Sequence, residues 1–66
     1  MNYPYDIEIE ERMYLFSQTL NESDLRRYAG LEAMRLGHGG IIYISKVLKM
    51  TEKTVSKGLK EVKKNI

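Results

Sequence analysis

The apolar residues of the last third of the chain recur at helical spacing, and this periodicity limits the fold more than any other feature. An i, i+4, i+7, i+11 stripe places four of them on one helix face: Val55, Leu59, Val62 and Ile66. Earlier segments show comparable periods, as at Ile9, Met13, Phe16 and Leu20, and are separated by turn residues. We therefore predict a small all-α domain of four helices, at about residues 6–20, 22–36, 41–48 and 52–64.

The length of 66 residues fits one domain, which we expect to span residues 1–66 with residues 1–5 as an extended lead-in. A chain this short buries only about 60% of its unfolded surface. It contains no cysteine, so neither disulfides nor thiolate zinc sites can add stability.

No apolar run approaches the roughly 18 residues of a membrane span, and no secretory signal opens the chain. We expect a cytoplasmic binding protein without membrane association.

Residues that cap or stop helices set the first boundaries. Asp6 is a possible cap of the first helix, although residues 5–10 also alternate as a strand would. Asn21 resembles an N-cap, and Gly37 suits the position after a helix end. The helix between them is apolar on most sides, which indicates a central position. Glu32 lies within its apolar stripe, where we expect a structural hydrogen bond.

The glycine-rich loop at residues 37–40 differs from a phosphate-binding loop, because it follows a helix and no Lys-Ser or Lys-Thr pair follows it. His38 is the only histidine, and there is no cysteine to join it in a metal site. No nucleophile–base pair or metal cluster stands out. We expect no enzymatic activity, no cofactor, no metal and no small-molecule ligand.

The net charge of +2 conceals a strong asymmetry along the chain. Residues 1–22 carry five acids and one arginine, for −4; residues 23–45 carry +1; residues 46–66 carry seven lysines and two acids, for +5. Four lysines form a stripe opposite the apolar face of the last helix: Lys53, Lys57, Lys60 and Lys64. Such a stripe is either a solvated face or a surface for an anionic partner.

Two short helices joined by about three residues, with Thr51 as the N-cap of the second, match the helix-turn-helix pattern. In that arrangement helix 52–64 enters the major groove of double-stranded DNA, where lysines contact phosphates and Thr54 and Ser56 can reach base edges. Tyr43 and Lys46 are expected to point away from the apolar face of helix 41–48. The predicted DNA-contacting residues are Lys53, Thr54, Ser56, Lys57, Lys60, Lys49, Tyr43 and Lys46.

Residues 20–62 resemble the N-terminal DNA-binding segment of one family of bacterial DDE insertion-sequence transposases. The matching elements are Leu20-Asn21-Glu22, Arg26-Arg27, Ala29, Glu32-Ala33, Leu36-Gly37, Gly39-Gly40-Ile41, Thr54-Val55, Gly58-Leu59 and Glu61-Val62. The resemblance implies a helix-turn-helix that recognises the terminal repeats of a mobile element. It suggests a small transcriptional regulator or a mobile-element accessory protein.

The chain departs from that family in two places. Lys49 stands where the turn glycine is found, which implies either a left-handed lysine or a changed turn. The chain ends at Ile66, so the RNase-H-like domain with its three metal-binding carboxylates is absent, and transposase activity is not carried over. We expect a stand-alone DNA-binding protein in preference to a fragment, because the chain begins with Met1 and carries no tag.

Three further expectations concern contacts. Gly58 lies inside a helix beside the apolar stripe, which indicates a close helix–helix approach. We also expect a homodimer to accompany DNA binding. Candidates for the dimer contact are Ile7, Tyr14 and Leu15, although we favour the alternative that these residues pack against helix 22–36. The alternative function is a protein-interaction module that binds an acidic partner through the lysine face; its apolar anchors would be Ile42, Tyr43 and Val47.

Overall fold

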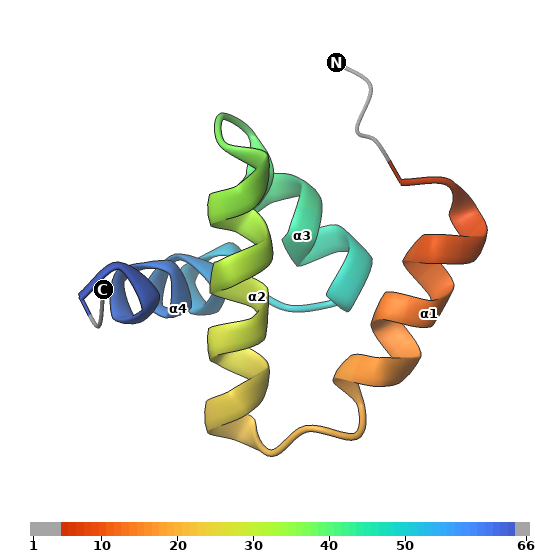
Figure 1. Ribbon diagram of the computed structural model, residues 1–66, viewed down its shortest axis with the longest axis horizontal. Helices are drawn as coiled ribbons and strands as arrows, with labels where there is room; N and C mark the ends of the chain where they lie inside the picture. The colour runs from red at the N-terminus through yellow and green to blue at the C-terminus, as the bar shows by residue number, and fades with distance from the viewer. Residues whose placement is uncertain (1–4, 65–66) are drawn as a thin grey trace.

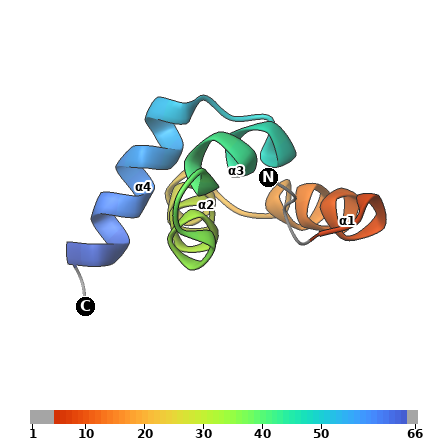
Figure 2. The same ribbon diagram turned by 90° about the horizontal axis from the view of Figure 1, so that it is seen from above.

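The computed structural model describes residues 5–64, which form four helices and no strand, and this confirms the predicted all-α class. The helices are α1 (Ile7–Ser17), α2 (Glu22–Leu36), α3 (Gly40–Leu48) and α4 (Glu52–Lys64). Figure 1 shows α2 in the middle, with α4 and α1 on its two sides. Seen from above, α3 lies across α2 and connects the two flanks (Figure 2). Within residues 5–64 no helix combines the length and apolarity that a bilayer crossing requires.

Side-chain caps begin three of the helices, as the sequence predicts. A carboxylate oxygen of Asp6 accepts from the backbone N–H of Ile9 at 3.0 Å, and the Asn21 side chain accepts from the N–H of Asp24 at 2.8 Å. The Thr51 hydroxyl accepts from the N–H of Thr54 at 3.2 Å. These bonds satisfy N–H groups that have no partner inside the helix, so they fix where each helix begins.

The first helix is shorter than predicted, because it ends at Ser17 and not near residue 20. The backbone N–H of Thr19 bonds to the carbonyl of Phe16, and its hydroxyl donates to the same carbonyl at 2.7 Å. Leu20 continues this tighter i to i+3 pattern with the carbonyl of Ser17. Side chains that compete for backbone carbonyls favour turns over helix, which explains the early end.

The connections on either side of α3 use left-handed backbone. Gly37 and Gly39 have φ values of +76° and +82° in the loop that precedes α3. Lys49 has φ 57° and ψ 46° at the C-cap of α3, and its N–H bonds to the carbonyl of Ser45. Lys49 therefore has the left-handed conformation at the position where the transposase family that this chain resembles has the turn glycine. The turn between α3 and α4 contains three residues, as the sequence predicts.

A small core lies where α2, α3 and α4 meet. Its buried apolar side chains are Ala29, Ala33, Ile44, Leu48 and Val55. They come from three helices, which confirms the central position expected for α2. Among the apolar residues of α1, Met13 packs against the core, whereas Ile9 and Phe16 are exposed, because α1 packs at the edge of the domain.

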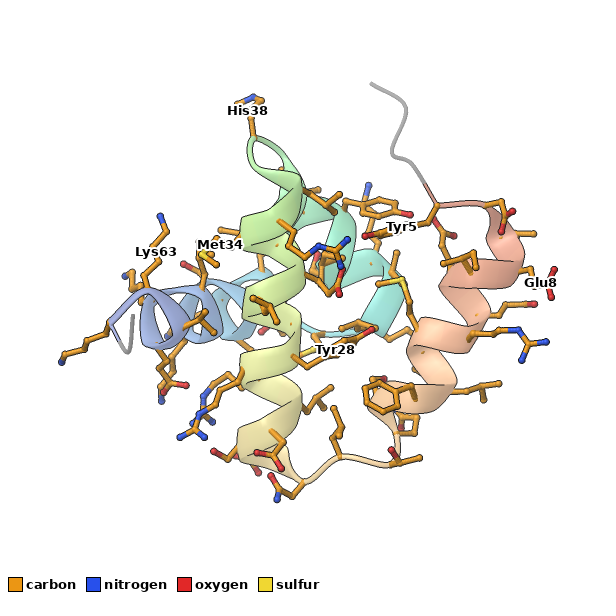
Figure 3. The ribbon with its side chains drawn as sticks, in the orientation of Figure 1. Tyr5, Glu8, Tyr28, Met34, His38 and Lys63 are labelled. Carbon is orange, nitrogen blue, oxygen red and sulfur yellow. The ribbon has the colours of Figure 1, made fainter. Side chains whose placement is uncertain are left out.

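The predicted hydrogen bond of Glu32 is confirmed. This carboxylate is 8% exposed and accepts from the Tyr5 hydroxyl at 3.1 Å and from Arg35 Nη1 at 3.1 Å. Burial, followed by the charge of Glu32, raises the pKa of Tyr5 above its ordinary value. Tyr5 also stands 6.2 Å, centroid to centroid, from the ring of Tyr43, between α3 and α1 (Figure 3). Of the expected lead-in, residues 1–4 lie outside the described part of the chain.

Two glycines allow α2 and α4 to cross in backbone contact. A Cβ atom at Gly58 would overlap the backbone carbonyl of Arg26, and one at Gly30 would overlap the backbone of Gly58. Both glycines are buried. The close approach predicted for Gly58 is therefore confirmed, and Gly30 is its counterpart on α2. The crossing fixes α4 on α2 at the level of the main chain.

Candidate nucleic-acid interface

The lysine stripe of α4 faces solvent. Val55 and Gly58 are buried on the inner face, whereas the lysines on the other side are all exposed: Lys53, Lys57, Lys60 and Lys64. The helix carries two acids, and neither interrupts the stripe: Glu52 opens the helix and Glu61 turns toward α2. The result is a continuous cationic face on one helix. The fourth member of the predicted apolar stripe, Ile66, lies outside the described residues.

The two predicted base-edge residues differ in their surroundings. Thr54 is half-buried, and its hydroxyl accepts from the Thr51 hydroxyl at 2.9 Å within the cap of α4. Ser56 is also half-buried, and its hydroxyl makes no hydrogen bond to any residue in 5–64. Both stand in the first turns of α4, beside the lysine face. Ser56 is therefore the more available of the two polar groups.

A cluster of opposite charges joins α2 to α4. Arg26 Nε donates to Glu61 Oε1 at 2.9 Å, and this bond lowers the pKa of Glu61 and raises that of Arg26. The charges of Lys57 and Arg27 also lower the pKa of Glu61. Positive groups from α2 therefore adjoin the cationic face of α4.

The sequence interpretation missed this arginine contribution, because it treated the arginine pair as part of a separate helix. Arg26 and Arg27 are far from α4 in sequence, and only the crossing of the two helices brings them to its side. The available signal was the pair of small residues, Gly30 and Gly58, which permits such a crossing. Gly58 alone does not identify its partner on α2.

Three predicted DNA-contacting residues lie on a different side of the molecule. The Tyr43 hydroxyl donates to Glu10 of α1, and burial together with this bond raises the pKa of Tyr43. Lys49 Nζ lies 4.5 Å from the centroid of the Tyr14 ring. Lys46 is exposed in a groove between α1 and α3. The prediction that Tyr43 is open to a partner was wrong, because α1 covers this side of α3.

This α1–α3 groove has a volume of about 580 Å³. Lys46, Val47 and Lys49 form its α3 wall, and the residues of its α1 wall are Ile7, Glu10, Glu11, Tyr14 and Leu15. Ile7 is 74% exposed and Leu15 is 63% exposed. The expectation that these two residues pack against helix 22–36 was therefore wrong, because α1 meets the rest of the domain mainly through Glu10, Met13 and Ser17.

A second groove, of about 460 Å³, lies between the end of α2, the glycine loop and α4. Met34 and Lys63 line it, and His38 lies at its edge on the tip of the loop (Figure 3). Ile42, one of the anchors considered for a protein partner, also lines it and is 49% exposed. Among residues 5–64 no group of His, Asp and Glu side chains could hold a metal ion.

Comparison of the chain with models of known protein families, with curated proteins and with solved structures gives no match. The resemblance to transposase segments therefore stays a prediction from the quoted motifs.

Proposed function

We propose that this protein binds double-stranded DNA, with α3 and α4 acting as a helix-turn-helix and α4 entering the major groove. The observation that carries the proposal is the exposed lysine face of α4, which no acidic residue interrupts. A solvated helix usually mixes charges of both signs on its outer face. A face of one sign suits a partner with regularly spaced negative charges.

The lysines would supply affinity that depends on charge and not on base sequence. Each lysine that neutralises a phosphate releases condensed counterions, so binding weakens as salt rises. Arg27 and Arg26 lie beside this face and extend it toward α2. Because α4 itself contains no arginine, it lacks the side chain that most often reads guanine. We therefore propose modest sequence preference, with Ser56 as the most available polar contact to a base edge.

The crossing of α2 and α4 supports this role. A helix that enters a groove must be held rigidly by the rest of the domain, or ordering it on binding costs free energy. The backbone contact at Gly30 and Gly58 holds α4 without intervening side chains. The protein would accordingly act as a small regulator or as an accessory to a mobile element.

The decisive experiment measures binding to duplex DNA over a range of salt concentrations. For the unmodified chain, the logarithm of the binding constant should fall linearly with the logarithm of salt concentration. The double variant Lys57→Ala with Lys60→Ala should bind more weakly, with a slope smaller by about 2, since each phosphate contact contributes about 0.9.

A charge-matched control removes two positive charges elsewhere. Arg12 and Arg35 pair with Glu8 and Glu32 on α1 and α2, away from the lysine face. The variant Arg12→Ala with Arg35→Ala, checked for helix content by circular dichroism, should keep the slope of the unmodified chain. Equal losses in the two variants, or binding that is insensitive to salt, would contradict the proposal. Selection from a random duplex pool then measures sequence preference.

A further inference from the structure

We propose that the α1–α3 groove is the interface of a symmetric dimer, in which the same groove of a second copy of this chain covers it. This inference does not depend on DNA binding, because the groove lies apart from the lysine face of α4. It rests on the exposed apolar residues of the groove, on the charges of its two walls, and on the two-fold axis that these charges favour.

The apolar part of the groove consists of side chains with no cover of their own. Ile7 and Leu15 are 74% and 63% exposed, more than any other large apolar residue in 5–64. Val47 stands half-buried on the opposite wall. Covering these side chains removes apolar surface from water, which is the main favourable term in association.

The charges of the groove are divided between its walls. Glu11 stands on the α1 wall and Lys46 on the α3 wall, both exposed, and neither forms an ion pair within residues 5–64. Their neighbours are already occupied inside the chain, since Glu10 accepts from Tyr43 and Lys49 lies over Tyr14. Glu11 and Lys46 are therefore available to form ion pairs with a partner.

These charges select one symmetry axis. A two-fold axis parallel to the groove lays the α1 wall of each copy against the α3 wall of the other, so that Glu11 faces the partner's Lys46, twice per dimer. An axis across the groove would instead set acid against acid and base against base. The first arrangement closes on itself as a dimer and leaves no surface for further growth.

The same division of charge argues for a second copy over an unrelated protein. An acidic partner would be repelled by Glu11, and a basic one by Lys46. A copy of this chain offers both signs at the matching positions, together with its own Ile7 and Leu15. The groove is therefore complementary to itself.

Sedimentation equilibrium of the full chain, up to millimolar concentration, tests the proposal. The unmodified chain should show a monomer–dimer equilibrium. Leu15→Lys should leave only monomer, because it replaces a buried apolar contact with a positive charge that faces the lysines of the opposite α3 wall, twice per dimer. The matched control is Leu31→Lys on α2, where Leu31 is 42% exposed but lines neither groove; it should dimerise normally. A monomeric unmodified chain, or equal effects of the two variants, would overturn the proposal.

Charge reversal tests the axis. Glu11→Lys and Lys46→Glu should each weaken self-association about tenfold, since each dimer loses two ion pairs and gains two repulsions. An equimolar mixture of these two variants should dimerise as the unmodified chain does, because each heterodimer contact again joins opposite charges. A dimer that ignores both single substitutions, or a mixture that stays as weak as its components, would overturn this arrangement. Circular dichroism confirms that each variant is folded.

Discussion

The helices α4 and α1 flank the same central helix but are attached to it in different ways. The first crosses α2 in backbone contact at Gly30 and Gly58 and buries Val55 in the core. The second has one buried residue, Ser17, and touches its neighbours mainly through side-chain ends. Its contacts include the Tyr43–Glu10 hydrogen bond and the edge-on packing of Phe16 against Tyr28, at 5.2 Å between centroids.

This difference shows that one small domain can combine a fixed element with a weakly attached one. Backbone contact leaves no side chain that could move aside, so the position of α4 tolerates little change. Hydroxyl–carboxylate bonds and partly exposed rings each contribute about 1 kcal/mol and can break one at a time. We expect α2, α3 and α4 to form the stable unit, with α1 opening first.

The charges follow the same division. Figure 2 shows α1 and α4 on opposite sides of α2. The first turn of α1 carries Glu8 and Glu10, whereas the last turn of α4 carries Lys63 and Lys64. The asymmetry along the sequence is therefore also an asymmetry in space, with the acidic and basic flanks separated by the core.

The largest effect is expected from Gly58→Ala, which tests the fixed side of the comparison. The new methyl group would overlap the carbonyl of Arg26, and separating α2 from α4 should cost about 2 kcal/mol or more, despite the better helix propensity of alanine. Urea unfolding measures this change. Lys60→Ala on the outer face of the same helix serves as the control and should stay within about 0.5 kcal/mol of the unmodified chain. Unchanged or increased stability of Gly58→Ala would show that the two backbones are not in contact.

A smaller effect is expected from Tyr43→Phe, which tests the weakly attached side. Loss of the bond to Glu10 should cost about 1 kcal/mol and should raise hydrogen exchange in α1 while α2 and α4 stay protected. Tyr14→Phe is the matched control, because it keeps the ring beneath Lys49 and its hydroxyl makes no bond within the described residues. Equal loss of protection in all four helices would show that α1 is part of a single cooperative unit.

The smallest effect concerns pH and the polar link between α2 and α4. The bond from Arg26 lowers the pKa of Glu61 below its ordinary value of 4.5, so its stabilising contribution is present above that pH and is lost as the pH falls through the lowered value. An NMR titration should show this low pKa, and Arg26→Gln should return it toward normal. Arg12→Gln on α1 should leave it unchanged. If Arg26→Gln does not raise this pKa, the Arg26–Glu61 bond is not the cause of the shift.

Much of the fold is predictable from local sequence. The caps Asp6, Asn21 and Thr51 and the stop at Gly37 set most boundaries, because their hydrogen bonds and backbone angles act within one turn of helix. The outward direction of the α4 lysines follows from its period in the same way. The end of α1 was misplaced because the bond from the Thr19 hydroxyl to Phe16 outweighed the apolar spacing.

Which helix faces meet was decided only in the folded structure. Nothing in the spacing of α3 shows that α1 covers Tyr43, or that Ile7 and Leu15 stay outside. Nor does the spacing within α2 or α4 show that Arg26 contacts Glu61, which lies 35 positions later in the sequence. Periodicity defines an apolar or charged face on each helix, but not its neighbour. That choice depends on the shapes of all four helices packed together, and here on two glycines that let α2 and α4 touch.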